Sequence, residues 1–181
     1  MKTVFMGGSR SISRLNPALR AKLNAVLRKN YKIVIGDANG ADKAVQKHLH
    51  ERHYQNVVVF SMAQSRNNLG NWPTRYIRSE DATGGFEYYS RKDIRMVDDS
   101  DCGLMLWDGK SKGTLRNIHH LLQEDKTVLV YLSPEKKFYS LTRPNELRSF
   151  LAHHSPAALR RLESDHSFTA SAKSDQPAFD F

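Results

Sequence analysis

The chain has little cysteine and no long apolar run. Its one cysteine, Cys102, cannot form a disulfide within the chain, which excludes the disulfide-stapled class of small secreted domains. The longest apolar runs, at 102–107 and 128–132, have the length of a strand and are too short to span a bilayer. The apolar run that follows Lys2 is too short for a secretory signal. We therefore expect a cytoplasmic protein that has no membrane partner.

Negative charge is scarce in the first third of the chain. Residues 1–60 carry eleven Lys and Arg against three acidic residues, a net charge of +8. Residues 61–140 carry twelve against eleven, and residues 141–181 carry five against five. A basic field of this kind suits an anionic partner such as a nucleotide phosphate or a nucleic acid. Many of these basic residues lie in helical patterns, so solvated helix faces explain them equally well, and both interpretations stay open.

Short apolar segments alternate with amphipathic segments along the first 132 residues. Alternation at this spacing is typical of a parallel sheet that carries helices on both faces. The sequence therefore predicts an α/β fold, a Rossmann-like parallel sheet of about five strands. The predicted strands are 2–6, 32–35, 56–61, 102–107 and 127–132, and the predicted helices are 16–30, 41–53, 86–99 and 114–124.

Two stretches depart from this alternation. Residues 64–85 are polar, rich in turn-forming residues and without a period, which predicts a long loop or lid. Within it, Trp72 and Tyr76 have two interpretations: they stack on a base, or they anchor the loop to the core. Residues 144–164 predict two short helices, because a proline stands at or near each start. We expect a Rossmann-like domain over 1–140, a small helical C-terminal extension over 141–165 and an unstructured tail over 166–181.

Three predicted strands end in loops that are rich in glycine and polar side chains: "GGSR", "GDANGAD" and "DGKSKGT". Ligands of open α/β sheets bind at the carboxyl ends of strands, where glycine admits close approach and helix N-termini favour anions. We therefore predict a phosphate-bearing ligand. The candidate ligand-binding residues are Gly7, Gly8, Ser9, Arg10, Gly36, Asp37, Ala38, Gly40, Asp42, Asp108, Gly109, Lys110, Ser111, Gly113 and Thr114.

These loops, together with "SRKDIRMVDDSD" before the fourth predicted strand, resemble the motifs of the SLOG superfamily. That superfamily includes bacterial DNA-processing protein A and the Lonely Guy phosphoribohydrolases. The resemblance covers about residues 1–132, and "WDGKSKGT" is most similar to the YpsA-related branch of small bacterial and phage proteins. It implies a Rossmann-like fold whose strand-end loops bind nucleotides or nucleotide-derived, ADP-ribose-like ligands.

The resemblance also implies where catalytic residues would stand. In Lonely Guy enzymes, an arginine in an R-K-x-x-M helix and a glutamate three residues after a Gly-Thr pair act at an N-glycosidic bond. Arg91 stands in a similar place and is the candidate catalytic residue, whereas Asn117 occupies the glutamate position. Because an amide cannot act as a general base, another acid would have to substitute. The acids considered for that role are Asp37, Asp42, Glu87 and Asp108.

Three functions follow from these observations. The leading hypothesis is a protein that binds a nucleotide or a nucleotide-derived ligand and, if it is an enzyme, an N-glycosidic hydrolase or transferase. The alternatives are a single-stranded DNA-binding accessory that uses the basic residues 1–60, and a non-catalytic nucleotide sensor. We predict no cofactor and no metal site, because no cysteine or acid completes a ligand set around His48, His50 and His53. A homo-oligomer stays open.

Overall fold

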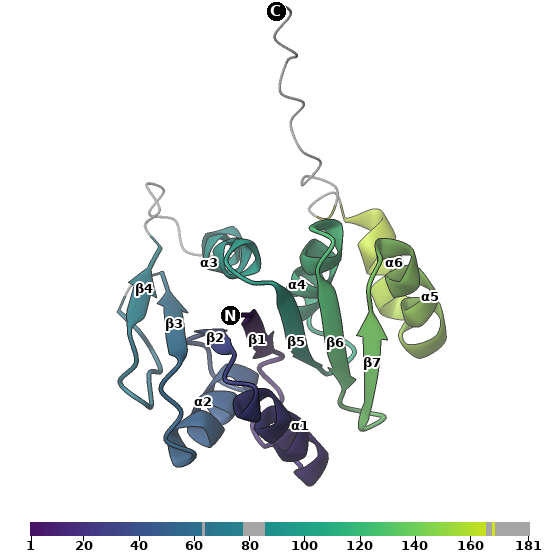
Figure 1. Ribbon diagram of the computed structural model, residues 1–181. Helices are drawn as coiled ribbons and strands as arrows, with labels where there is room; N and C mark the ends of the chain where they lie inside the picture. The colour runs from purple at the N-terminus through teal and green to yellow at the C-terminus, as the bar shows by residue number, and fades with distance from the viewer. Residues whose placement is uncertain (63, 78–85, 166–167, 169–181) are drawn as a thin grey trace, which may run out of the picture.

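The described residues form one sheet of seven strands (Figure 1). The computed structural model describes residues 1–62, 64–77, 86–165 and 168, and for residues 86–89 it describes the backbone alone. The strands are β1 (Thr3–Gly8), β2 (Lys32–Gly36), β3 (Val57–Ser61), β4 (Thr74–Tyr76), β5 (Cys102–Trp107), β6 (Thr127–Leu132) and β7 (Lys137–Leu141), in the spatial order β4-β3-β2-β1-β5-β6-β7.

All neighbouring strands are parallel except β6 and β7, which pair antiparallel. This confirms the predicted Rossmann-like fold class, with two strands more than expected. The three residues of β4 lie at one edge of the sheet, inside the stretch predicted as a loop. The hairpin partner β7 lies at the other edge, where its "KFYSL" sequence has no clear alternation of apolar and polar residues.

Helices cover both faces of the sheet (Figure 1). α1 (Pro17–Arg28) and α2 (Ala41–Glu51) lie on one face, and α3 (Phe86–Asp98) and α4 (Lys112–Gln123) lie on the other. α5 (Pro144–His154) and α6 (Pro156–Ser164) lie beside β7. Among the described residues, no helix is long and apolar enough to span a membrane.

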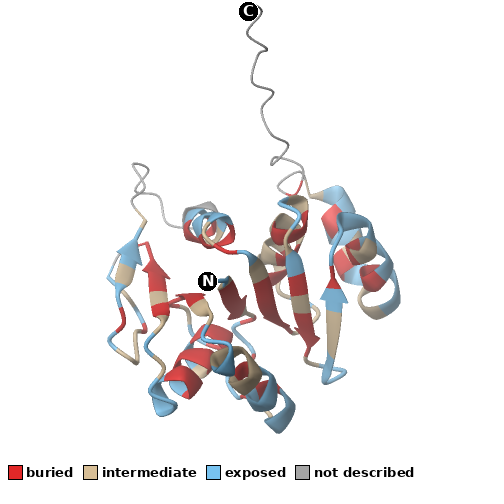
Figure 2. Ribbon diagram, in the orientation of Figure 1, coloured by how far each residue is buried: buried red, intermediate tan, exposed pale blue. Residues whose placement is uncertain are grey.

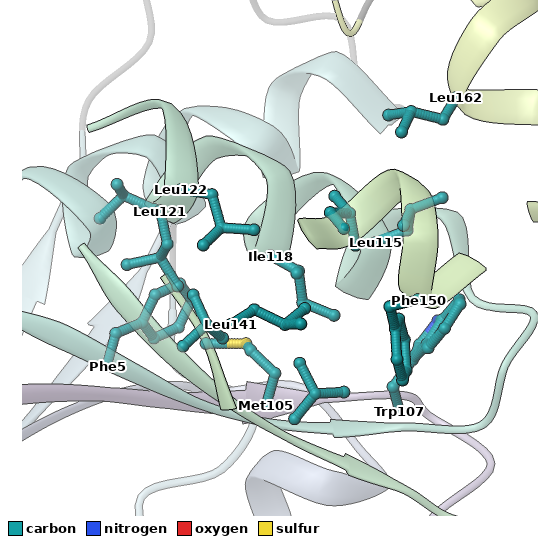
Figure 3. Packing of buried hydrophobic residues seen from close by; sticks show 14 of the residues in the cluster. Phe5, Met105, Trp107, Leu115, Ile118, Leu121, Leu122, Leu141, Phe150 and Leu162 are labelled. Carbon is teal, nitrogen blue, oxygen red and sulfur yellow. The ribbon is translucent and has the colours of Figure 1, made fainter. Parts of the chain in front are cut away.

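The alternation of side chains along each strand divides the core between the two faces. In β1, Phe5 packs in the cluster under α3 and α4, whereas Val4 and Met6 pack in the cluster under α1 and α2. The two clusters lie on opposite faces of the sheet, and most residues of the central strands are buried (Figure 2). Figure 3 shows the first cluster, in which labelled residues include Phe5, Met105, Trp107, Leu115, Ile118, Leu121, Leu122, Leu141, Phe150 and Leu162.

The C-terminal helices belong to the same packing. Leu147 and Leu151 of α5 are fully buried in the cluster that contains Trp107. Phe168 is also buried in this cluster, and the rest of the predicted tail lies outside the described residues. The division of the chain at residue 140 stays a prediction.

The polar stretch before α3 is held to the core by Trp72. Its side chain is 4% exposed and its Nε1 donates a hydrogen bond to the Tyr54 carbonyl oxygen, at 2.8 Å. Tyr76 is 56% exposed. The structure therefore favours the anchoring interpretation for Trp72. The last part of the predicted lid, residues 78–85, lies outside the described residues.

Candidate functional site

The loops that follow β1 and β5 diverge at the carboxyl edge of the sheet. β1 and β5 are adjacent strands, yet β1 is followed by a helix on one face and β5 by a helix on the other. This is the topological switch point, where open α/β sheets bind their ligands. A cavity of about 590 Å³ lies there, between these loops and α3.

Nine of the predicted residues line this cavity. They come from three loops that are far apart in the sequence: Gly7, Gly8, Arg10, Ala38, Asp42, Asp108, Ser111, Gly113 and Thr114. Four further predicted residues of the β1 and β2 ends and their loops are buried and do not line the cavity: Ser9, Gly36, Asp37 and Gly40. Gly109 and Lys110 instead line a second, smaller cavity. Arg91 is exposed on α3 and does not line the first cavity, so its catalytic role stays a prediction.

Glycine is required where the loops touch one another. A Cβ atom at Gly8 would lie 2.2 Å from the Leu106 carbonyl oxygen. That oxygen belongs to the backbone of β5, which its pairing with β1 holds in place. Gly40 has a φ of +84°, and a Cβ there would lie 2.3 Å from the Arg10 carbonyl oxygen. Both positions therefore exclude any larger residue, because the loops after β1, β2 and β5 pack backbone to backbone.

Ser9 joins the three loops by hydrogen bonds. Its amide donates to the Leu106 carbonyl oxygen at 2.9 Å, and its carbonyl oxygen accepts from the Ala41 amide at 3.2 Å. Its Oγ accepts from the Asp108 amide at 3.1 Å and lies 3.3 Å from Thr114 Oγ1. Ser9 is 1% exposed and supports these loops in the structure, and its predicted role as a ligand contact stays a prediction.

Asp108 orders the loop that leads into α4. Its carboxylate accepts hydrogen bonds from Ser11 Oγ at 2.7 Å and from the amides of Lys110 and Ser111 at 2.9 and 2.7 Å. Burial disfavours the charged carboxylate, but these hydrogen bonds outweigh it and hold the pKa of Asp108 below its usual range. Three hydrogen-bond donors therefore stabilise the negative charge at this point of the rim.

Asp37 is occupied by Arg66, a residue that the sequence did not single out. The guanidinium makes a two-point contact, at 2.9 and 3.2 Å, and the Arg66 amide and Ser61 Oγ donate to the same carboxylate. Although burial raises the pKa of Asp37, the Arg66 contacts prevail and lower it. This pair fixes the start of the polar stretch that Trp72 anchors further along, and it leaves the Asp37 carboxylate fully hydrogen-bonded.

A buried group of charges forms the inner wall of the cavity. Lys92 Nζ, on a side chain 6% exposed, lies 2.9 Å from Asp93 Oδ1. A Cβ at Gly36 would lie 2.5 Å from Asp42 Oδ2 and 3.0 Å from Lys92 Nζ. Because glycine has no side chain, the Asp42 carboxylate and the Lys92 ammonium can both lie against the Gly36 backbone. Burial raises the pKa of Asp42 to about 6, against the opposing attraction of Lys92.

Lys92 and Asp93 were missed by the prediction, which selected Arg91 from the same segment. The apolar pair Met96 and Val97 gives the signal that would have found them, because Met96 marks the inward face of α3. Residues three and four positions earlier, Asp93 and Lys92, lie on that same face of a helix. Arg91 lies outside this face and is exposed.

The comparisons with known proteins bear on the fold. No protein-family model matches the chain, and no curated protein matches it. Among solved structures, DNA processing protein A from Helicobacter pylori matches with a TM-score of 0.52 and 18% sequence identity. The fold is shared. The match covers 71% of this chain and 64% of that chain, whose structure concerns the binding of single-stranded DNA. At this identity the likeness extends to the fold alone.

Proposed function

We propose that the protein binds single-stranded DNA through its backbone phosphates, at the cavity between the β1 and β5 loops. The observation that carries the proposal is Arg10. Among the residues that the structure describes, its exposed guanidinium has no hydrogen bond or ion pair, although it lines the cavity. A guanidinium whose five donors are all available is suited to two-point contact with a phosphate.

The other cations of the cavity are already engaged. Arg66 pairs with Asp37, Lys92 with Asp93, and Lys112 with Asp165 at 2.6 Å. Arg10 is therefore the cavity cation with the most to gain from an added anion.

Three further observations support an anionic strand. Gly113 lines the cavity in the first turn of α4, where backbone amides lack helical acceptors and the helix dipole favours negative charge. The net charge of +8 over residues 1–60 favours polyanions in general. The matched solved structure, with which this chain shares its fold, is of a protein that binds single-stranded DNA.

The test is the affinity for a fluorescent oligothymidylate, measured by anisotropy. Charge-assisted hydrogen bonds contribute about 1.5–3 kcal/mol, so Arg10→Ala should weaken binding about ten- to a hundredfold. Arg10→Lys should fall in between, because it keeps the charge and loses the planar fork. Arg28→Ala is the matched control: Arg28 is exposed in the last turn of α1, which precedes β2 at the amino edge of the sheet.

Salt gives a second measurement on the same variants. The slope of log affinity against log salt should become shallower by about 0.7 in Arg10→Ala, the value for one phosphate contact on a single strand. Equal affinities for the wild type, Arg10→Ala and Arg28→Ala would contradict the proposal, as would a wild-type affinity that does not depend on salt.

A mononucleotide ligand is the second candidate, and the concavity of the site favours it. A cavity of about 590 Å³ lies within the range of small-ligand pockets. Asn117 Nδ2 donates to Asp93 Oδ2 at 3.3 Å, so the Asp93 carboxylate lies beside the position where the resemblance implies a glutamate. A thermal-shift series over nucleotides tests this candidate, since a ligand at a hundred times its Kd adds about 2.7 kcal/mol of stability.

A further inference from the structure

A second cavity, of about 350 Å³, lies on the other side of the loop after β5. The two cavities share Asp108, so they lie next to each other along the carboxyl edge of the sheet. The loop after β6 and the turn between α5 and α6 form its remaining walls. A DNA strand that occupies the first cavity would therefore have the second cavity directly beside it.

Hydrogen bonds from the C-terminal helices build this second cavity. Ser155 Oγ donates to the Gly109 carbonyl oxygen at 2.8 Å, and a nitrogen of the Arg161 guanidinium donates to the Lys110 carbonyl oxygen at 2.8 Å. Gly109 has a φ of +79°, which lets the loop turn its carbonyl toward Ser155. The loop is thus held between the two cavities by contacts on both sides.

The acids of the second cavity are engaged by local hydrogen bonds, whereas its cations keep donors available. Glu135 accepts hydrogen bonds from Tyr139 and from His154 Nδ1, and Asp108 accepts them from Ser11 and from the Lys110 and Ser111 amides. Within the described part of the chain, Lys110 Nζ has no hydrogen bond or ion pair. Arg161 uses one of its nitrogens on the loop, so the rest of the guanidinium remains for a ligand.

The remaining wall is apolar. Pro134, Ala157 and Ala158 line the cavity beside the two cations. An anion-binding group next to a small apolar surface matches a nucleotide, whose phosphate is charged and whose sugar and base present apolar faces.

We propose that the second cavity binds the adjacent nucleotide of the same DNA strand, with Lys110 and Arg161 on its phosphate. This inference rests on the proposed function. It makes the helical extension part of the binding surface, and it makes the affinity depend on the length of the strand, because two linked contacts reinforce each other.

The experiment compares a short strand, a thymidine dinucleotide without terminal phosphates that therefore carries a single phosphate, with a long oligothymidylate of about twelve nucleotides, each bound to the full chain. The wild type should bind the long strand more tightly than the short one. Lys110→Gln and Arg161→Gln should each reduce that advantage, and the double variant should lose about tenfold in affinity for the long strand relative to the short one. Arg160→Gln is the matched control, because Arg160 is exposed on the same helix and outside the cavity lining.

Two variants keep the test clear of loop disruption. Lys110→Gln removes the charge of a side chain that makes no hydrogen bond or ion pair with the described residues, and Arg161→Lys should restore part of the long-strand advantage that Arg161→Gln loses. An unchanged length dependence in Lys110→Gln and in the double variant would overturn the inference. If Arg10→Ala weakens both strands in that same result, the proposed function stands and the second cavity alone is refuted; if Arg10→Ala weakens neither, the proposed function itself fails.

Discussion

Asp42 should make the protein less stable as the pH rises, and Asp42→Asn should remove this effect. The side chain is 6% exposed, and one oxygen accepts a hydrogen bond from the Ala38 amide at 3.2 Å. Burial raises its pKa from 3.8 to about 6. An asparagine has nearly the same shape and still accepts from Ala38, so the substitution removes the buried charge with little change in packing.

The sign follows from linkage. The folded protein holds the Asp42 proton more tightly than the unfolded chain, so this group destabilises the fold progressively as the pH rises from about 4 to about 6. A rise of about two pKa units corresponds to about 3 kcal/mol, present in full above pH 6. Lys92 loses one carboxylate neighbour in the variant and keeps Asp93 at 2.9 Å.

Urea unfolding from about pH 4 to about pH 7.5 measures this difference. The stability of Asp42→Asn relative to the wild type should increase with pH by up to about 3 kcal/mol. Asp98→Asn, an exposed aspartate at the end of α3, is the control. A difference between Asp42→Asn and the wild type that stays constant or falls with pH would refute the reasoning.

Two other substitutions test the site and its support. Trp72→Ala should cost about 3–5 kcal/mol in urea unfolding, because the ring is 4% exposed and Nε1 loses its bond to Tyr54, whereas Tyr76→Ala should cost less than about 0.5 kcal/mol. Equal losses in the two would show that Trp72 is not an anchor. Gly113→Val should leave the melting temperature nearly unchanged and weaken oligonucleotide binding more than about tenfold, since it adds bulk to the cavity wall in the first turn of α4. Unchanged anisotropy titrations would contradict that placement of the ligand.

The central strands and the glycine-rich loops were predictable because their signals are local. The apolar run of β5 and the glycines after it lie within about ten residues of one another, so the sequence shows them together. The topology of a parallel sheet then brings such loops to one edge. The helix starts were also local: Asn16 accepts from the Leu19 amide at 2.9 Å, and a proline follows it. From these local features, the sequence analysis named nine residues that line the first cavity.

The missed parts depend on contacts between distant segments. Arg66 looks like one more polar residue of an irregular stretch until the fold brings it to Asp37, 29 positions away. The edge strand β7 exists because β6 offers it a free side, which its own sequence does not indicate. The second cavity likewise requires Ser155 to reach a loop 46 positions earlier.

The close packing at Gly8 and Gly40 has a consequence for reading related sequences. Both glycines are demanded by neighbouring backbone, with contacts of 2.2 and 2.3 Å for an added Cβ, whether or not a ligand binds. A descendant that lost all affinity for its ligand would still have to keep them in order to fold. Divergence of function should therefore show first at Arg10 and Lys110, whose side chains make no hydrogen bond or ion pair with the described residues, while the glycine signature persists.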